Sequence, residues 1–246
     1  MADSNREYFE RGYPQRWGLP APSDVVRLEA SGLCHLLQLS PASCVIDIGC
    51  GHGRHAIALA ERGPEVIGLD FAVALLSRAQ HFTAASGARV HWIRGDMRQL
   101  PFRSRCADAA IMLDAFGLFD TEDEHEAVLR ETARVIRIGG RLGVKVINGG
   151  PVIDHFRKSD REKRHGKVIS ISRTLTLDPP RLTETIMISG PFGLGEYERR
   201  QRLYRVEELC TALKRAGLAI FGVFARPDGT PFDPTLSSTI WIVGQR

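Results

Sequence analysis

Three glycines at alternate positions interrupt the stretch VIDIGCGHGRH, residues 45–55. Gly49, Gly51 and Gly53 let the chain turn tightly and let a ligand approach the backbone without a Cβ in the way. The stretch follows a hydrophobic run of strand length and precedes a helical pattern, which is where doubly wound folds bind nucleotides. The pattern predicts a nucleotide-binding turn, and a tight turn without a ligand is the alternative.

Two acidic residues farther along the chain favour the nucleotide interpretation. Asp70 follows the glycines by about 20 residues at the end of the next expected strand, where a carboxylate can accept both hydroxyls of a ribose. Asp96 ends the third expected strand and could receive an adenine amino group, with Met97 beside the ring. A dinucleotide site prefers a glycine where Arg54 stands, so the spacing favours a nucleoside without a pyrophosphate.

The elements that must position these residues alternate between strands and helices. Ser23 can cap a first helix, and Thr121 has Glu124 three residues later, which is a capping-box spacing. Short runs rich in Val and Ile predict five strands over residues 44–49, 65–70, 89–96, 109–114 and 141–148. This order is typical of an α/β fold, a parallel sheet with helices on both faces.

The rhythm changes after Asn148, where residues 167–178, 181–190 and 196–206 show period-2 alternation typical of antiparallel strands. A helix over 206–217 and strands over 218–225 and 238–246 follow. We expect four parts, namely an N-terminal lid segment, a cofactor-binding core, an antiparallel insertion that covers the substrate or forms an interface, and a last part completing the core. Their bounds are 1–22, 23–148, 149–205 and 206–246.

The motif DIGCGHG, the acid at 70, the GD at 95–96 and the segment LRETARVIRIGGRLGVKV together resemble the class I S-adenosylmethionine-dependent methyltransferases. The resemblance implies a Rossmann-like seven-stranded sheet whose final strand pair is reversed, with S-adenosylmethionine as cofactor and no metal. Asp47 would orient the glycine loop or help bind the methionine amino group. Arg54 would close over the cofactor carboxylate or cap a helix, and His55 fits a satisfied, partly buried histidine. The cofactor-binding residues that the resemblance implies are Asp47, Gly49, Gly51, Arg54, Asp70, Phe71, Asp96, Met97 and Leu113.

The acceptor side is marked by aromatic residues. GRHAIALAERG, AFGLF, RLYRVEEL and DGTPFDP resemble bacterial small-molecule methyltransferases, among them the antibiotic N-methyltransferases of the lincosamide type. An N-terminal segment of that kind folds over the cofactor as a lid, although EYFERGYPQRW would also suit a helix packed on the core. The sequence lacks the Asn/Asp-Pro-Pro-aromatic motif after the fourth strand, which counts against methylation of a nucleobase amino group. The resemblance implies Tyr8, Tyr13 and Phe116 as catalytic residues, and Trp17, Phe119, Tyr197 and Tyr204 as substrate-binding residues.

Methyl transfer from a sulfonium is an in-line displacement that depends on positioning, and aromatic rings attract its cationic groups. A neutral amine needs no strong base, so we expect N-methylation of a small natural-product or antibiotic intermediate. A hydroxyl acceptor would need a base, for which Asp114, His155 and His52 are candidates. The basic runs at 156–167 and 198–202 leave methylation of RNA or protein as an alternative. A regulator that binds the cofactor without catalysis is a further alternative.

Composition fits this class without deciding it. The formal net charge is +4, and the five cysteines are scattered without a CxxC pair, which suits reduced thiols. Neither a signal peptide nor a membrane-spanning apolar run is apparent in the sequence. We therefore expect a cytoplasmic enzyme with no membrane partner, and the sequence disfavours a nucleic-acid partner. Assembly of a homo-oligomer through the insertion stays open.

Overall fold

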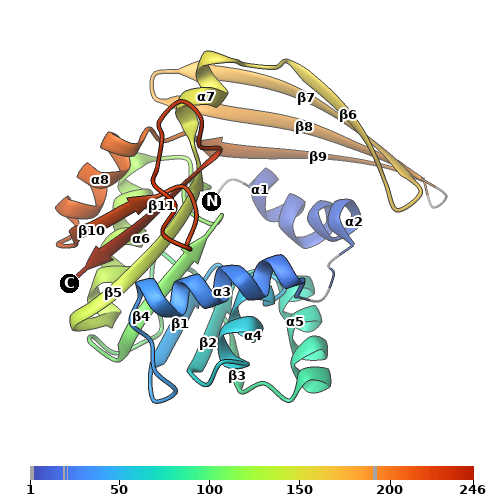
Figure 1. The fold of residues 1–246 in the computed structure, drawn as a ribbon. Coiled ribbons are helices and arrows are strands. Elements are labelled where there is room, and N and C mark those ends of the chain that lie inside the picture. Colours follow the sequence, from blue (N-terminus) through green and yellow to red (C-terminus); the bar gives the residue numbers. More distant parts are fainter. Residues whose placement is uncertain (1–2, 19, 21, 191–192) are drawn as a thin grey trace.

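The computed structural model describes residues 3–18, 20, 22–190 and 193–246. Its centre is a seven-stranded sheet of order β10-β11-β5-β4-β1-β2-β3 (Figure 1). β11 runs antiparallel to both of its neighbours, whereas the pairs among β1 to β5 are parallel. The predicted Rossmann-like α/β fold with a reversed final pair is confirmed. The strands are β1 (Cys44–Ile48), β2 (Glu65–Asp70), β3 (Val90–Arg94), β4 (Ala107–Leu113), β5 (Ile136–Ile147), β10 (Ala219–Phe224) and β11 (Thr239–Gln245).

Helices cover both faces of this sheet because each carries one apolar stripe. One face packs against α3 (Asp24–Leu36), α4 (Arg54–Ala60) and α5 (Val73–Ser86), and the other against α6 (Glu122–Val135) and α8 (Val206–Arg215). The Ser23 hydroxyl accepts a hydrogen bond from the backbone N–H of Val26, and Thr121 forms the expected capping box with Glu124. Local sequence thus sets where these two helices begin.

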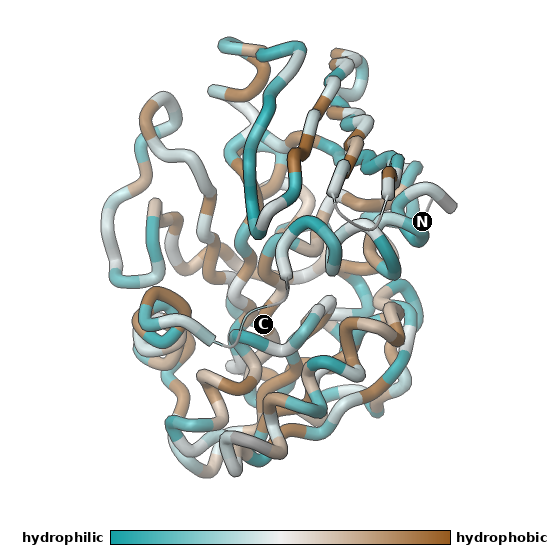
Figure 2. Tube along the Cα trace, turned by 90° about the vertical axis from the view of Figure 1, so that its right-hand side faces the viewer, coloured by the Kyte–Doolittle hydropathy of each residue, from teal (hydrophilic) through white to brown (hydrophobic). Residues whose placement is uncertain are grey.

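A second, four-stranded antiparallel sheet follows β5 and lies above the first (Figure 1). Apart from its charged edge strand, hydrophobic and polar residues alternate along the strands of this sheet, so one face is apolar (Figure 2). The residues Pro191 and Phe192 of the expected turn lie outside the described residues. After the short helix α7 (Gly149–Asp154), the strands are β6 (Ser159–Arg164), β7 (Lys167–Leu177), β8 (Pro180–Gly190) and β9 (Gly193–Arg202).

The strand β6 was not expected, because its sequence SDREKR reads as a charged, solvated run. It pairs with β7 at the edge of the sheet, and Asp160, Arg161 and Lys163 are exposed. Charged residues on an edge strand oppose the addition of another strand. This edge therefore gives no support to assembly through the insertion, which stays a prediction.

The N-terminal segment lies between the two sheets as α1 (Asp3–Glu7), a π-helical turn η1 (Tyr8–Gly12) and α2 (Tyr13–Trp17) (Figure 1). Asn5 is fully buried and anchors it, donating from Nδ2 to the carbonyls of Leu118 (2.7 Å) and Arg200 (2.8 Å). Its Oδ1 accepts from the backbone N–H of Arg200 (2.7 Å). Glu10 accepts hydrogen bonds from the first N–H groups of α5. Residues 1, 2, 19 and 21 of the predicted lid lie outside the described residues.

Within the described residues, no helix is long and apolar enough to cross a membrane.

Candidate active site

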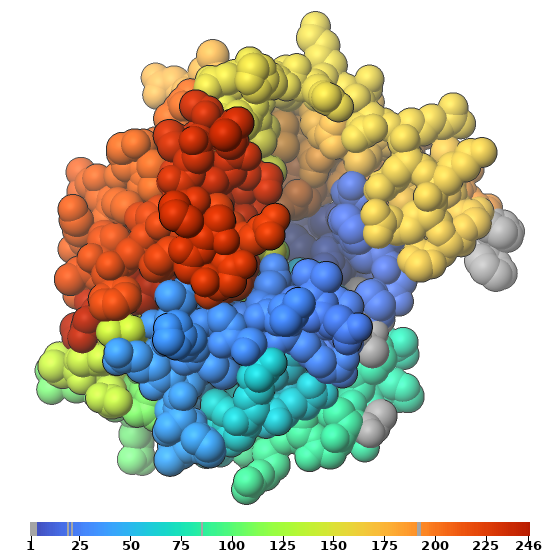
Figure 3. All heavy atoms as spheres, viewed as in Figure 1, coloured from blue at the N-terminus to red at the C-terminus, as the bar shows by residue number. Residues whose placement is uncertain are grey.

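A cavity of about 480 Å³ lies at the carboxyl ends of β1, β2 and β4, beneath the N-terminal helices and the second sheet. Figure 3 shows the hollow between α3 in blue, the segment before β11 in red, and the second sheet in yellow. The carboxyl edge of the parallel strands is where open α/β sheets bind ligands. The cavity therefore occupies the position that the glycine loop predicts.

The glycine loop needs glycine for two different reasons. Gly49, Gly51 and Gly53 have φ values of 74°, 58° and 79°, a region that residues with a Cβ rarely adopt. A Cβ on Gly49 would lie 2.5 Å from that of Ala115, and one on Gly53 would lie 2.3 Å from the Trp92 ring. A Cβ on Gly51 would meet nothing closer than 4.0 Å. The backbone at Gly51 is therefore bare on a side that a ligand can approach.

Two buried carboxyl groups flank this loop. Asp70 accepts hydrogen bonds from the backbone N–H of Gly51 (2.8 Å) and of Ala72 (2.9 Å), so it also holds the loop in place. Burial raises the pKa of Asp70 despite these bonds. Burial, and then the nearby charge of Asp70, raise the pKa of Asp47 to about 7. At neutral pH the Asp47 carboxyl can thus exist in either protonation state.

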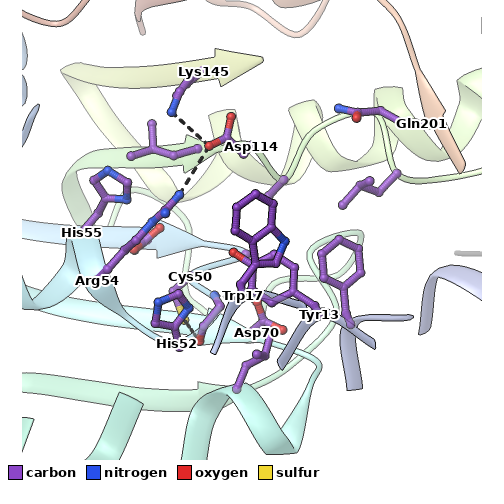
Figure 4. Close-up of a pocket in the computed structure, with 18 of the residues that line it drawn as sticks. Tyr13, Trp17, Cys50, His52, Arg54, His55, Asp70, Asp114, Lys145 and Gln201 are labelled. Atoms are coloured by element: carbon purple, nitrogen blue, oxygen red, sulfur yellow. Dashed lines mark hydrogen bonds and ion pairs between the residues drawn. The ribbon is translucent and has the colours of Figure 1, made fainter. Parts of the chain in front are cut away.

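A charged network forms another wall of the cavity (Figure 4). Asp114 has a φ of 60°, which few residues other than glycine, asparagine and aspartate adopt, and its Oδ2 lies 3.1 Å from Lys145 Nζ and 3.6 Å from Arg54 Nη2. Behind it, the Glu29 carboxylate lies 2.8 Å from His55 Nε2 and 3.9 Å from Lys145 Nζ. Burial lowers the pKa of His55, so a neutral ring donates to Glu29. His55 is the satisfied histidine that was expected, although it also lines the cavity.

His52 lies between the glycine loop and the N-terminal segment. Its side chain is buried, and its ring centroid lies 6.3 Å from that of Tyr13. The ring also forms a hydrogen bond with the backbone of Pro20. Burial, followed by the charge of Arg54, lowers the pKa of His52 to about 4. The imidazole is therefore neutral and weakly basic at pH 7.

Aromatic rings of the N-terminal helices form the roof of the cavity. Tyr8, Phe9, Tyr13 and Trp17 all line it, and Tyr8 is only 2% exposed because it packs on the apolar face of the second sheet. Arg16 donates hydrogen bonds to the Tyr8 hydroxyl and to Glu162 of β6. The N-terminal helices thus cover the cavity and pack on the second sheet, and their role as a lid stays a prediction.

The structure brings nearly all of the predicted cofactor residues to this one cavity. Asp96 is the exception, since it lines a smaller recess beside the cavity and forms an ion pair with Arg98 (2.5 Å). Phe71 and Met97 line both spaces. Those that line the main cavity are Asp47, Gly49, Gly51, Arg54, Asp70, Phe71, Met97 and Leu113.

Four predicted aromatic residues do not line the cavity, and their assignment to the acceptor site is corrected. Phe116 is 1% exposed and stacks on Tyr204 (5.2 Å between ring centroids) in the core between α6 and α8. The Tyr204 hydroxyl lies 2.8 Å from His125 Nδ1. Phe119 packs edge-on to His125, and Tyr197 is buried in the second sheet with its hydroxyl bonded to Gln15 (2.8 Å). Burial of a large apolar surface explains these four rings, whereas Tyr8, Tyr13 and Trp17 do line the cavity.

Sequence reasoning missed three polar residues at or behind the cavity wall. Lys145 interrupts the apolar run of β5, and a charge inside a buried strand is the signal that could have identified it. Glu29 on α3 and Gln201 on β9 carry no comparable local signal. Their roles depend on which strands and helices meet in space.

Comparison with known proteins supports the interpretation of the core that its sequence resemblance implies. Residues 45–140 match the family described as Methyltransferase domain, so this part of the chain is similar to a methyltransferase domain. Among curated proteins, a demethylmenaquinone methyltransferase of Mycolicibacterium gilvum is 40% identical over 108 residues, which are 44% of this chain and 43% of that protein. The chain thus matches about half of the length of its first curated relatives.

Solved structures share the whole fold. The CcbJ methyltransferase of Streptomyces caelestis superposes with a TM-score of 0.83 and 19% identity over 100% of this chain and 99% of that one. CalS10 of Micromonospora echinaspora, an amino pentose methyltransferase solved with S-adenosylmethionine bound, has a TM-score of 0.66 and 22% identity over 97% and 96% of the chains. The N-terminal helices and the second sheet therefore belong to the fold that these structures share.

The cavity fits S-adenosylmethionine, the cofactor that the sequence resemblance implies. Gly51 presents bare backbone, and Asp47 and Asp70 place buried carboxyl groups beside it. Asp70 already accepts two backbone hydrogen bonds, and its remaining lone pairs could accept ribose hydroxyls. An ammonium group of the ligand would offset the cost of ionising the buried Asp47 carboxyl. When bound, S-adenosylmethionine supplies an activated methyl group.

Proposed function

We propose that this protein transfers the methyl group of S-adenosylmethionine to an amine nitrogen of a small molecule, which aromatic rings place for in-line displacement. The observation that carries the proposal is the roof of Tyr8, Tyr13 and Trp17 over the carboxyl edge of the sheet. Such a roof excludes water and presents π-faces to a cationic sulfonium and to an amine that gains charge, each worth roughly 0.5–2 kcal/mol. Correct orientation of the two reactants can lower the activation barrier of methyl transfer by roughly 7–11 kcal/mol.

The chain's own residues would divide the binding of the two reactants. Asp70 would accept the ribose hydroxyls and Asp47 the methionine ammonium, with Arg54 placed for the carboxylate. The rings of Tyr8, Tyr13 and Trp17 would position the acceptor against the methyl group. In this proposal Phe116 supports the core and contacts neither reactant.

The candidate bases favour nitrogen over oxygen as the acceptor atom. His52 is a weak base because burial lowers its pKa to about 4. His155 is exposed and is absent from the described residues that line the cavity. Asp114 Oδ2 is already engaged by Lys145 and Arg54. A neutral amine carries its own lone pair and needs none of them.

The resemblance in fold agrees with an amine acceptor, since CalS10 is described as an amino pentose methyltransferase involved in calicheamicin biosynthesis. We extend the proposal to a natural-product or antibiotic intermediate as the acceptor. A cytoplasmic location and a homo-oligomeric state remain predictions within it.

A second candidate is methylation of a ring carbon or a hydroxyl. Curated relatives of the core are demethylmenaquinone methyltransferases, and the Asp114 side chain is 42% exposed in the cavity wall. A phenolic acceptor would need such a carboxylate to receive its proton. The matched segment of the first relative, however, covers less than half of either chain.

The proposal is tested by incubating the protein and cofactor with a panel of small amines, phenols and carboxylates, and by measuring the mass increase of one methyl group. We expect methylated amines. Products found only among phenols or carboxylates would overturn the proposal and favour the second candidate.

A further inference from the structure

A polar strip crosses the otherwise apolar inner face of the second sheet. Arg173 of β7, Glu184 of β8 and Arg199 of β9 are directly paired across the strands. Glu184 accepts from Arg173 Nε (2.9 Å) and from Arg199 Nη1 (3.1 Å), and it is 6% exposed. Burial opposes ionisation of Glu184, but the two guanidinium groups hold its pKa below the usual value. One carboxylate thus lies between two cations, and Asp160 of β6 lies 3.9 Å from Arg173, which is the cation farther from β9.

Gln201 extends this strip toward the cavity. It lies two residues beyond Arg199 on β9, so both side chains are on the same face of the sheet. Its Oε1 accepts from Arg199 Nη2 (2.5 Å), which fixes the orientation of the amide. The amide NH₂ must then face another way, and Figure 4 shows the side chain directed toward the side of the cavity where Asp114 lies. Arg199 and Gln201 both line the cavity.

Arg199 and Gln201 offer more hydrogen-bond donors than the neighbouring acceptors use. Arg199 offers five N–H groups, of which the contacts with Glu184 and Gln201 use two. No acceptor among the described residues binds the Gln201 amide nitrogen, and Gln201 lines the cavity. An amide donor that faces a cavity can bind an oxygen of a ligand, and a planar guanidinium suits a carboxylate or phosphate. The two side chains together offer the donors that an oxyanion needs.

We propose that Arg199 and Gln201 form a subsite that binds an oxyanion of the acceptor, either a carboxylate or a phosphate group. This inference rests on the proposed function, because it describes the amine that the enzyme methylates. The acceptor would carry its anionic group at the second sheet and its amine beneath the aromatic roof.

The test compares amines that differ only in the anionic group. Phenylalanine is paired with phenylalaninamide, and glucosamine 6-phosphate with glucosamine, which separates carboxylate from phosphate. Binding to the protein loaded with S-adenosylhomocysteine is measured by calorimetry, and methylation by product mass. We expect the anionic member of at least one pair to bind and react about 10- to 100-fold better. No preference for either anionic member would overturn the inference.

Variants assign that preference to the subsite. Gln201→Glu places a like charge against the oxyanion and should abolish the preference, and Gln201→Met, which only removes the donors, should reduce it. Arg200→Gln is the matched control, because Arg200 is exposed on the opposite face of β9 and should keep the wild-type preference. An anionic preference that survives in Gln201→Glu would contradict the subsite. Methylation confined to hydroxyl compounds would instead contradict the proposed function, so the two failures are distinguishable.

Discussion

The buried carboxyl of Asp47 connects cofactor binding to pH. Its pKa of about 7, caused mainly by burial, means that it must lose a proton before it can hold an ammonium group. The affinity for S-adenosylmethionine should therefore fall as the pH drops below 7, by about tenfold per unit. Calorimetric titrations between pH 5.5 and 8.5 measure this slope.

Asp47→Asn is the comparison for that experiment, because it keeps the size of the side chain and cannot ionise. We expect weaker binding with a flat pH dependence. An unchanged slope in the variant would show that another group carries the titration.

A substitution of Phe116 distinguishes a residue that stabilises the core from one that contacts a reactant. Because its ring is buried against Tyr204, Phe116→Ala should lower the free energy of unfolding by about 3–5 kcal/mol. Cofactor affinity of the folded variant should stay within about twofold of the wild type. Chemical denaturation and calorimetry check the two parts, with Phe116→Leu as the milder control. A variant of normal stability that lost all turnover would contradict the core assignment.

The contrast between Asp70 and Phe116 shows what sequence can specify at this scale. The position of Asp70 beside the glycine loop was predictable, because its spacing from the glycines and its place at the end of a strand can be seen in the sequence. Phe116 was not, since an aromatic residue after a strand serves a core or a pocket equally well. The packing of α6 and α8 decides which way the ring points, and no short motif records that packing.

At the scale of elements, the buried amide of Asn5 should control whether the N-terminal helices stay closed. Asn5→Ala leaves two carbonyls and one N–H without their partners, which costs about 2 kcal/mol locally. Hydrogen exchange in α1 to α2 should then speed up by more than about tenfold, while exchange in β1 stays unchanged. Mass spectrometry after peptide digestion measures both.

Glu7→Gln provides the matched control in the same helix, since Glu7 is exposed and lies 4.0 Å from Arg11. Such a surface ion pair contributes little, so exchange should be near that of the wild type. Equal exchange in Asn5→Ala and Glu7→Gln would show that Asn5 is not the anchor.

Strand β6 illustrates what element patterns leave open. The alternation in β7, β8 and β9 predicted three antiparallel strands because one face is apolar. The run SDREKR has no such alternation, and it becomes a strand only because β7 offers an edge for pairing. Tertiary pairing overrides local preference at this position.

For the whole molecule, His52 should make stability depend on acid pH. The ring is neutral in the folded protein because burial lowers its pKa to about 4, whereas an unfolded histidine protonates near 6.5. Its contribution is therefore complete above about pH 6.5 and is lost as the pH falls toward 4. His125 behaves similarly, and Asp47, whose pKa is raised, acts in the opposite direction.

The difference between wild type and His52→Gln isolates this one group. Between pH 7.5 and pH 5, the wild type should lose about 2 kcal/mol more in the free energy of unfolding than the variant does. Urea denaturation at the two pH values measures that difference. Equal losses would show that His52 does not titrate in the way its burial indicates.

The fold, the glycine loop and the roof lead to one central claim, that the accepting atom is nitrogen. It is tested most directly by supplying S-adenosylmethionine with a ¹³C-labelled methyl group to the protein and the acceptor panel, and by recording the carbon spectrum of the products. The proposal predicts the label in an N–CH₃ group. A label found only on oxygen or on a ring carbon would contradict it.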